Sequence, residues 1–233
     1  MNLIAHLEEF TLLEWILFSL LSNIALYLFS IGLYIVIDQT CAKQKIQDEA
    51  FPVTPSDVYL SLLTVVLNTV VMLIAVYCWK IGWLEYNESA TLAVSIVEII
   101  GIVLVMDFLM FVFHYLAHSP GLYPLLHYRH HEHSSTNYLS LFVLHPFETL
   151  GFGLMMITVF ICYDFSITAI AAYVFINLVW GTIGHLNREF FPKWADRLYV
   201  GTTRFHNQHH IDERHNFGFY TSIWDRLFRT FKR

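Results

Sequence analysis

Histidine is concentrated in the second half of this 233-residue chain. Twelve of the thirteen histidines lie between His114 and His215, and eight of them fall into three short motifs. The motifs read HxxxH, HxxHH and HxxHH, and their histidines are His114, His118, His127, His130, His131, His206, His209 and His210. Neutral imidazole is a common ligand of iron, zinc, copper and nickel, whereas magnesium and calcium prefer oxygen. The motifs therefore predict a metal site, and ligand type alone leaves iron and zinc both open.

The spacing inside each motif indicates how the ligands are shared between ions. Residues four apart lie on one face of a helix, so His114 and His118 can reach the same metal. In the second motif His127 and His130 lie about one helical turn apart, while His131 points elsewhere and can serve another ion. The third motif is expected to repeat this arrangement. Two neighbouring metal ions are therefore predicted.

Other polar residues are expected to complete or orient this set of ligands. His185 is predicted to be a ninth ligand, whereas His6, His133 and His215 are expected to be ordinary hydrogen-bonded histidines. Asp107 lies seven residues before His114 on about the same helix face, so we expect its carboxylate to orient a ligand imidazole. Three further residues are expected to surround the ligands, namely His145, Glu148 and Asn187.

The composition indicates a membrane protein rather than a water-soluble domain. Hydrophobic residues make up 56% of the chain, charged residues 14%, and the mean hydropathy is +0.52. Segments 12–37, 58–79 and 92–115 are each long enough to cross a hydrocarbon core, which needs about 20 helical residues. A fourth apolar region is interrupted by Asp164, which favours a helical hairpin of 147–163 and 165–184. The second piece is expected to span the membrane, and the first to span, tilt or re-enter.

We therefore expect an all-α integral membrane protein with about four transmembrane helices. Residues 1–233 are predicted to form one membrane domain, in which 1–90 supply N-terminal spans and connectors and 91–233 form the histidine-rich catalytic region. After Asn187 the sequence mixes aromatic with basic residues, which is typical of a segment at the membrane interface. This segment is expected to form a helical cap that holds the dimetal site.

The distribution of charge predicts the orientation in the membrane. Nine of the thirteen Lys and Arg residues follow His185, so the positive-inside rule places that end of the chain in the cytoplasm. Counting back through the predicted spans puts all three histidine motifs on the cytoplasmic side and the N-terminus outside. The net charge of −6 argues against a nucleic-acid partner. The residues before the first span lack Lys and Arg, so we expect that span to be retained rather than cleaved as a signal.

Several common alternatives lack their sequence signature. There is no HExxH motif and no Cys–His zinc finger, and the three cysteines are isolated from one another, which disfavours disulfides and thiolate metal sites. There is also no GxGxxG nucleotide fingerprint and no cysteine set for an iron–sulfur cluster. Any redox reaction at this site is therefore expected to draw electrons from another protein.

From Asp107 to the C-terminus the chain resembles the fatty acid hydroxylase/sterol desaturase superfamily of membrane di-iron enzymes. The resemblance rests on DFLMFVFHYLAH, HYRHHEHSSTN, LHPFE, RFHNQHH and NFGFYTSIWDRLFRTF. It implies a four-helix membrane fold with a cytoplasmic cap and two Fe ions, for which Zn can substitute on purification. Their ligands would be the eight motif histidines together with His185. It also implies a bacterial inner membrane or the endoplasmic reticulum as the location.

The resemblance implies that the enzyme uses O2 as co-substrate to hydroxylate a C–H bond of a membrane lipid. The lipid would be a fatty acyl, alkyl-ether or sterol-type molecule, and a reductase, ferredoxin or cytochrome b5-like protein would donate electrons. Desaturation by the same centre is the alternative, because both reactions begin by removing hydrogen. A histidine-based metal transporter is a rival of another class, but it predicts histidines at mid-membrane depth in several spans. A purely structural metal site would need fewer ligands.

Overall fold

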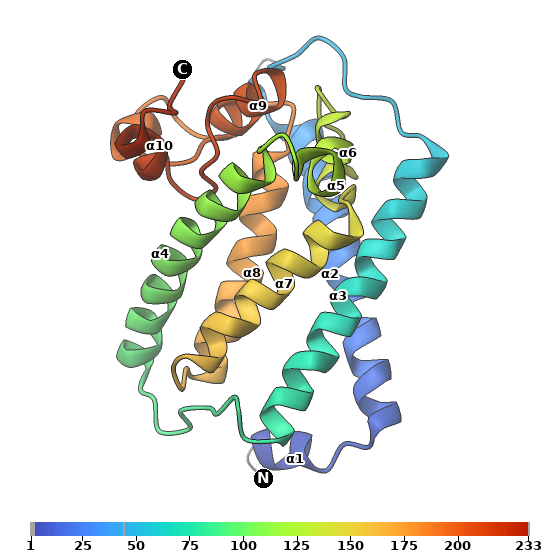
Figure 1. Cartoon of the computed structure of the whole chain (residues 1–233), viewed down its shortest axis with the longest axis vertical. Coiled ribbons are helices and arrows are strands. Elements are labelled where there is room, and N and C mark those ends of the chain that lie inside the picture. Colours follow the sequence, from blue (N-terminus) through green and yellow to red (C-terminus); the bar gives the residue numbers. More distant parts are fainter. Residues whose placement is uncertain (1–2, 44, 233) are drawn as a thin grey trace.

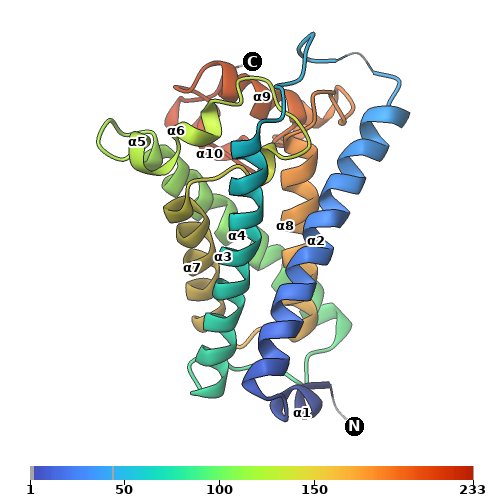
Figure 2. The ribbon, with the colours of Figure 1, turned by 90° about the vertical axis from the view of Figure 1, so that its right-hand side faces the viewer.

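The fold consists of helices joined by loops. The computed structural model describes residues 3–43 and 45–232, and within these ranges it contains no β-strand, only two isolated β-bridges. Four of its helices are long and apolar enough to cross a membrane: α2 (Leu12–Thr40), α3 (Pro55–Lys80), α4 (Leu92–Ala117) and α8 (Ile167–Gly184). They run side by side along the long axis of the molecule (Figures 1 and 2). The prediction of an all-α membrane protein with about four spans is confirmed.

The predicted hairpin corresponds to α7 (Pro146–Ile161) followed by α8. α7 is apolar but shorter than the spanning helices. It descends beside α3, and the chain turns back into α8 near the lower end of α4 (Figure 1). The turn contains Asp164, and Ser166 caps the N-terminus of α8 through a 3.2 Å bond from the backbone N–H of Ala169. The polar interruption in the apolar sequence therefore marks this turn.

Polar capping residues mark the N-terminal starts of the other long helices. Thr11 and Thr54 form capping boxes with Glu14 and Asp57 at the starts of α2 and α3. Thr91 caps α4 in the simpler way, by accepting a bond from the backbone N–H of Val94. Each cap satisfies backbone donors that the first turn of a helix leaves without a partner.

Hydrogen bonds between small polar side chains join the spanning helices. Ser30 of α2 lies 2.7 Å from Thr182 of α8, oxygen to oxygen, and Tyr27 of α2 lies 3.0 Å from Ser61 of α3. Such pairs add to packing between helices in lipid, where apolar side chains gain little by meeting one another. They hold α8 and α3 against α2 and thereby fix the end of the bundle that carries the histidines.

The remaining short helices gather mainly at that end. They are α5 (Tyr123–Leu126), α6 (Tyr128–His131), η1 (Ser140–Phe142), η2 (Ala195–Leu198), α9 (Thr203–Ile211) and α10 (Ile223–Phe228). Together they form a helical cap over the ends of α4 and α8, whereas α1 (Leu3–Glu8) lies at the opposite end of the bundle (Figures 1 and 2). The cap includes the predicted segment after Asn187 and also α5, α6 and η1, which precede it.

Candidate metal centre

The nine predicted ligands come from four parts of the chain that meet at the cap end. His114 lies in the last turn of α4 and His118 is the residue that ends this helix. The second motif occupies α6 and the residue before it, and the third lies on α9. His185 ends α8. The termini of two spanning helices and two short cap helices therefore position all the ligands.

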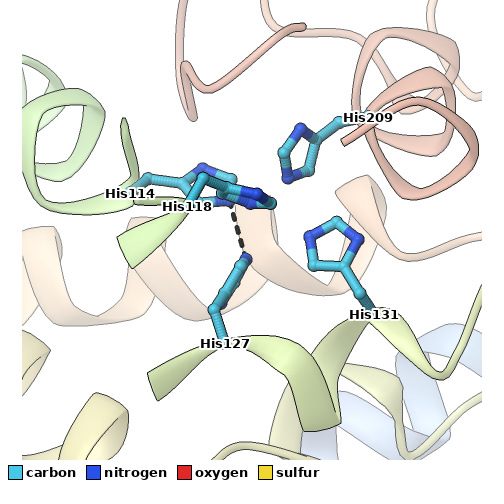
Figure 3. A group of neighbouring side chains, drawn as sticks. All are labelled: His114, His118, His127, His131 and His209. Atoms are coloured by element: carbon cyan, nitrogen blue, oxygen red, sulfur yellow. Dashed lines mark hydrogen bonds between the residues drawn. The ribbon is translucent and has the colours of Figure 1, made fainter. Parts of the chain in front are cut away.

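The histidines form two groups. The first histidine group contains His114, His118, His127, His131 and His209. The second histidine group contains His130, His185, His206 and His210. Within each group one ring nitrogen per residue lies within 4.8 Å of those of all the other members. Figure 3 shows the rings of the first group turned toward one another from α4, the α6 segment and α9. Two groups agree with the two metal ions expected from the sequence.

The histidines of each HxxHH motif are divided between the two groups in a different way from the prediction. His127 and His131 share the first group while His130 belongs to the second, and on α9 the pair His206 and His210 shares the second group. The prediction paired the first two histidines of each motif and was wrong. On a helix, residues four apart differ by about 40° in direction and residues three apart by about 60°, on opposite sides. The outer pair is therefore the better aligned, and the middle histidine faces the other group.

Backbone carbonyl groups fix the orientation of three of the rings. The Nδ1 atom of His114 lies 2.8 Å from the carbonyl oxygen of Phe217, and that of His185 lies 2.7 Å from the carbonyl oxygen of Gly181. The carbonyl oxygen of His215 is 2.7 Å from Nδ1 of His209. A carbonyl oxygen can only accept, so each Nδ1 must carry the proton and donate it. In the neutral ring Nε2 then presents a lone pair to its group.

A carboxylate orients a fourth ring. Nδ1 of His127 lies 2.6 Å from Oε1 of Glu148, and both side chains are buried. Such a carboxylate–histidine pair is common behind metal ligands, where it fixes the ring and raises the basicity of the other nitrogen. The expectation that Glu148 lies beside the ligands agrees with this contact.

The histidine ring nitrogens of the two groups are arranged better for binding metal ions than for hydrogen bonding to one another. Among the described residues, Nε2 of His118, His131 and His209 is buried and has no hydrogen-bond partner. In the second group Nε2 of His185 lies 3.2 Å from that of His130 and 3.1 Å from that of His206. Two nitrogens bound at about 2.1 Å to one metal, with bonds at a right angle, lie about 3 Å apart. Converging lone pairs at this spacing suit a shared cation.

Burial keeps the ligand histidines outside the spans neutral. Desolvation, with a smaller contribution from neighbouring histidines, lowers the pKa of His118 to about 2 and that of His131 to about 3. Desolvation also lowers the pKa of His185 to about 4, against a partly opposing hydrogen bond to Gly181. A protonated imidazole cannot bind a metal, so the environment preserves the form that can.

Asp107 does not play the predicted role of orienting an imidazole. Its carboxylate is buried and accepts hydrogen bonds from the C-terminal segment: from the backbone N–H groups of Tyr220 and Thr221, the Thr221 hydroxyl and the Trp224 indole. The bonds from Tyr220 and the Trp224 indole measure 2.8 and 3.0 Å. The predicted helix face is the one that carries Asp107 and His114 toward the C-terminal segment. Donors of that segment take up the hydrogen-bonding capacity of the carboxylate, so that no ligand ring bonds to it.

His145 and Asn187 also make their hydrogen bonds to groups other than the ligand rings. His145 caps the start of α7, where its Nδ1 accepts a bond of 3.3 Å from the backbone N–H of Phe147. The side chain of Asn187 bonds the backbone of Gln47 in both directions, at 2.9 Å each. Asn187 therefore holds the connector before α3 against the end of α8. Neither side chain hydrogen-bonds a ligand ring, in contrast to Glu148, although all three were expected to surround the ligands.

Some residues that support the site have no simple sequence signal. His133 is fully buried, and its ring nitrogens lie 3.2 Å from Oδ1 of Asp57 and 2.8 Å from the hydroxyl of Ser140. Asp57 also binds Arg129 at 2.6 Å, which ties the start of α3 to α6. The expectation that His133 is a hydrogen-bonded histidine rather than a ligand agrees with these contacts.

The NFG and WDR parts of the C-terminal motif position the Phe217 carbonyl. Asn216 adopts a left-handed conformation (φ 65°), and a side chain at Gly218 would collide with the backbone oxygen of Thr221. Asp225 accepts bonds of 2.8 and 2.7 Å from the backbone N–H groups of Phe217 and Gly218. This turn aims the Phe217 carbonyl at His114, a role that residue type alone does not reveal.

Comparison with known proteins agrees with this site. The family model described as fatty acid hydroxylase matches residues 99–230. The protein CER1-like 1 of Arabidopsis thaliana is 32% identical over 136 residues, which cover 54% of this chain and 22% of that protein. Human cholesterol 25-hydroxylase is 29% identical over 63% of this chain and 55% of its own length. A Delta(7)-sterol-C5(6)-desaturase of Nicotiana tabacum is 27% identical over 65% of this chain and 52% of its own length.

The match over more than half of the chain shows that it belongs to the fatty acid hydroxylase family. The matched region begins within α4 and includes every histidine of both groups. The chain spans about a fifth of the CER1-like relative and about half of the two sterol enzymes. No solved structure matches it.

Proposed function

We propose that this chain is a membrane di-iron monooxygenase that inserts one oxygen atom of O2 into a C–H bond of a lipid. The observation that carries the proposal is the pair of histidine groups, whose neutral ring nitrogens converge at the end of an apolar helical bundle. Nine such ligands exceed what is needed to hold a small cap in place. Family membership and the names of the sterol relatives support lipid oxidation as the type of reaction.

The net reaction defines which substrates, electrons and protons must reach the metal centre. Hydroxylation converts R–H, O2, two electrons and two protons into R–OH and water. When bound, the two ions would supply the reductive activation of O2, a task for which protein side chains have no equivalent. Iron is preferred over zinc because the reaction requires a metal that changes oxidation state. The electrons are proposed to come from a reductase, ferredoxin or cytochrome b5-like protein.

The side chains of this protein would hold, orient and isolate the ions. The first histidine group would hold one ion and the second group the other. The Phe217 and His215 carbonyls and Glu148 would keep the rings of His114, His209 and His127 aimed inward. Most of the ligand rings are buried, so bulk water is largely excluded, which limits side reactions of a reactive centre.

The proposed substrate is a fatty acyl, alkyl-ether or sterol-type lipid. The spanning helices expose large apolar side chains over much of their length, so a substrate can approach from within a bilayer. We propose that the histidine end faces the cytoplasm of a bacterial cell, or the cytoplasmic side of the endoplasmic reticulum. The basic residues after His185 support that orientation.

The test is lipid mass spectrometry under ¹⁸O2 in cells that express either the intact chain or its His209→Ala variant. The intact chain should yield a lipid with one labelled oxygen, and the variant should not. A matched His215→Ala variant replaces a histidine outside both groups and should retain product, because it keeps the backbone carbonyl that orients His209. Absence of labelled lipid in the presence of a supplied reductase and mixed membrane lipids would count against the proposal.

Desaturation by the same centre is the second candidate function, supported by the sterol desaturase relative. It consumes the same O2, electrons and protons but releases two waters and leaves a double bond. In the same experiment it would give a lipid that has lost two hydrogens and gained no label. A transporter would give neither product but would move zinc across vesicles. Among the described spanning helices His114 is the only histidine, and it lies in a last turn, which disfavours transport.

A further inference from the structure

A groove on the outer surface of the bundle lies far from the histidines. It has a volume of about 520 Å³ and lies between the first half of α4 and the end of α7 with the following turn. Val94, Val97 and Val105 of α4 expose 37%, 69% and 48% of their surface, so the wall of the groove is open to lipid. Glu98 lies in this groove and His114 sixteen residues further on, a separation of about 24 Å along the helix.

Among the described residues that line this groove Glu98 is the only acidic one, and one of its two carboxyl oxygens lacks a hydrogen-bond partner. The residue is 5% exposed. Oε2 accepts hydrogen bonds from the backbone N–H and the hydroxyl of Ser166, at 3.0 and 2.6 Å. Oε1 is buried and has no hydrogen-bond partner among the described residues. A carboxyl group within a membrane span is costly unless paired, so the vacant acceptor indicates a missing donor.

The depth of Glu98 suits the polar end of a lipid. α4 has 26 residues and is about 39 Å long, whereas the hydrocarbon core of a bilayer measures about 30 Å. Glu98 lies six residues after Leu92, about 9 Å from the start of the helix, and is therefore just inside the boundary of the core. A polar depression adjoins the groove at Tyr163 and is lined by Asn87, Ser89 and Asp164. The acidic Asp164 disfavours an anionic headgroup there.

We infer that this groove binds a lipid alcohol, with its hydroxyl group donating to the Glu98 carboxyl group once the buried Oε1 turns toward the groove, and with its chain lying between α4 and α7. The alcohol is uncharged, supplies the missing donor at the correct depth and offers an apolar body to the valine-lined wall. The site lies at the end of the bundle opposite the histidines and is separate from the proposed reaction. Binding at this site is measured without enzymatic turnover, so the test of the site does not depend on the proposed function.

The test is photolabelling of the metal-loaded full chain in phosphatidylcholine nanodiscs with a C18 alcohol that carries a diazirine in its chain. Labelled peptides should map to 93–105 and 159–165. Unlabelled oleyl alcohol should compete at a concentration at least about tenfold lower than oleyl methyl ether, which lacks the O–H donor but keeps the chain. Equal competition by the two compounds, or labels elsewhere on the chain, would overturn the proposal.

Two variants make the test specific to the groove. Gly101 lines the groove and a side chain there would meet nothing within 4 Å, so Gly101→Leu should fill the groove without disturbing the helix and abolish labelling. Gly32 on α2 is equally open but lies outside the groove, so Gly32→Leu is the matched control and should label as the unaltered chain does. Labelling that survives Gly101→Leu would contradict the inference.

A third variant tests the hydrogen bond itself. In Glu98→Gln the amide oxygen should take over the two bonds from Ser166, which leaves the amide NH2 in the position of Oε1. This group donates instead of accepting, so the preference for the alcohol over the methyl ether should disappear while labelling by a lipid persists. A tenfold preference retained in this variant would show that Glu98 does not bind the hydroxyl group.

Discussion

Glu148 of α7 and His127 before α6 meet at 2.6 Å through Oε1 and Nδ1, with each side chain buried. No other carboxylate oxygen among the described residues lies within 3.5 Å of a ring nitrogen in either histidine group. The contact joins a helix of the apolar bundle to the short helix that carries the second motif. It therefore connects the packing of α7 directly to the orientation of one ligand.

Replacing Glu148 by Gln should weaken metal binding in the first histidine group. The amide oxygen still accepts the Nδ1 proton of His127 but carries no charge, and loss of such an outer partner lowers metal affinity by about 10–100-fold. Competition with a chelator, followed by elemental analysis, measures the change. His145→Asn is the control on the same helix, since asparagine also caps helices and His145 contacts no ligand ring. Equal metal affinity in Glu148→Gln and the unaltered chain would refute the role given to Glu148.

Neighbouring histidines on α9 should affect different ions. His209→Ala leaves four ligands in the first group and all four in the second, whereas His210→Ala leaves five in the first and three in the second. Each variant should bind one of its two ions more weakly, a different ion in each case, and Mössbauer spectra of the bound iron should differ between the two variants. Identical spectra from both would mean that the two histidines serve one shared ion.

Replacing Asp107 by Asn should lower stability more than metal affinity. The asparagine amide would place donors against the donors of Tyr220, Thr221 and Trp224, and lost bonds to a buried charge cost about 2–3 kcal/mol. The midpoint of thermal unfolding should fall by several degrees while the chain purified in the cold keeps two ions. If Asp107 instead acted on a ligand, metal would be lost with the midpoint unchanged.

Removing the metals should destabilise the fold, and zinc should restore stability without activity. Chelation leaves buried, unpaired ring nitrogens facing one another, and a ligand that binds only the folded state stabilises it in proportion to the logarithm of its concentration over Kd. The unfolding midpoint should rise again on adding either Fe²⁺ or Zn²⁺, but oxidised lipid should form only with Fe²⁺. Product formation by the zinc-loaded chain would exclude the proposed chemistry.

The sequence was a good guide to features that depend on local pattern. The apolar lengths predicted the four spans, and Asp164 predicted the turn between α7 and α8. The motif spacing, with His185, identified the histidines that converge. Helix geometry alone would have paired the outer histidines of each HxxHH motif, but which group each pair joins depends on how α6 and α9 are rotated against their neighbours. The partners of Asp107 were missed for a related reason, since they lie more than a hundred residues away in the sequence.

The turn at Asn216–Gly218 has a consequence for how the protein matures. Ribosomes deliver α2, α3, α4 and α8 to the bilayer before they complete the segment from Thr202 onward, which brings the last three ligands and the carbonyls behind His114 and His209. A nascent chain therefore has most of its membrane-embedded part in place while neither histidine group is complete. Metal capture would report that synthesis has passed the turn at Asn216–Gly218, and a chain terminated before this turn would remain metal-poor and open to degradation.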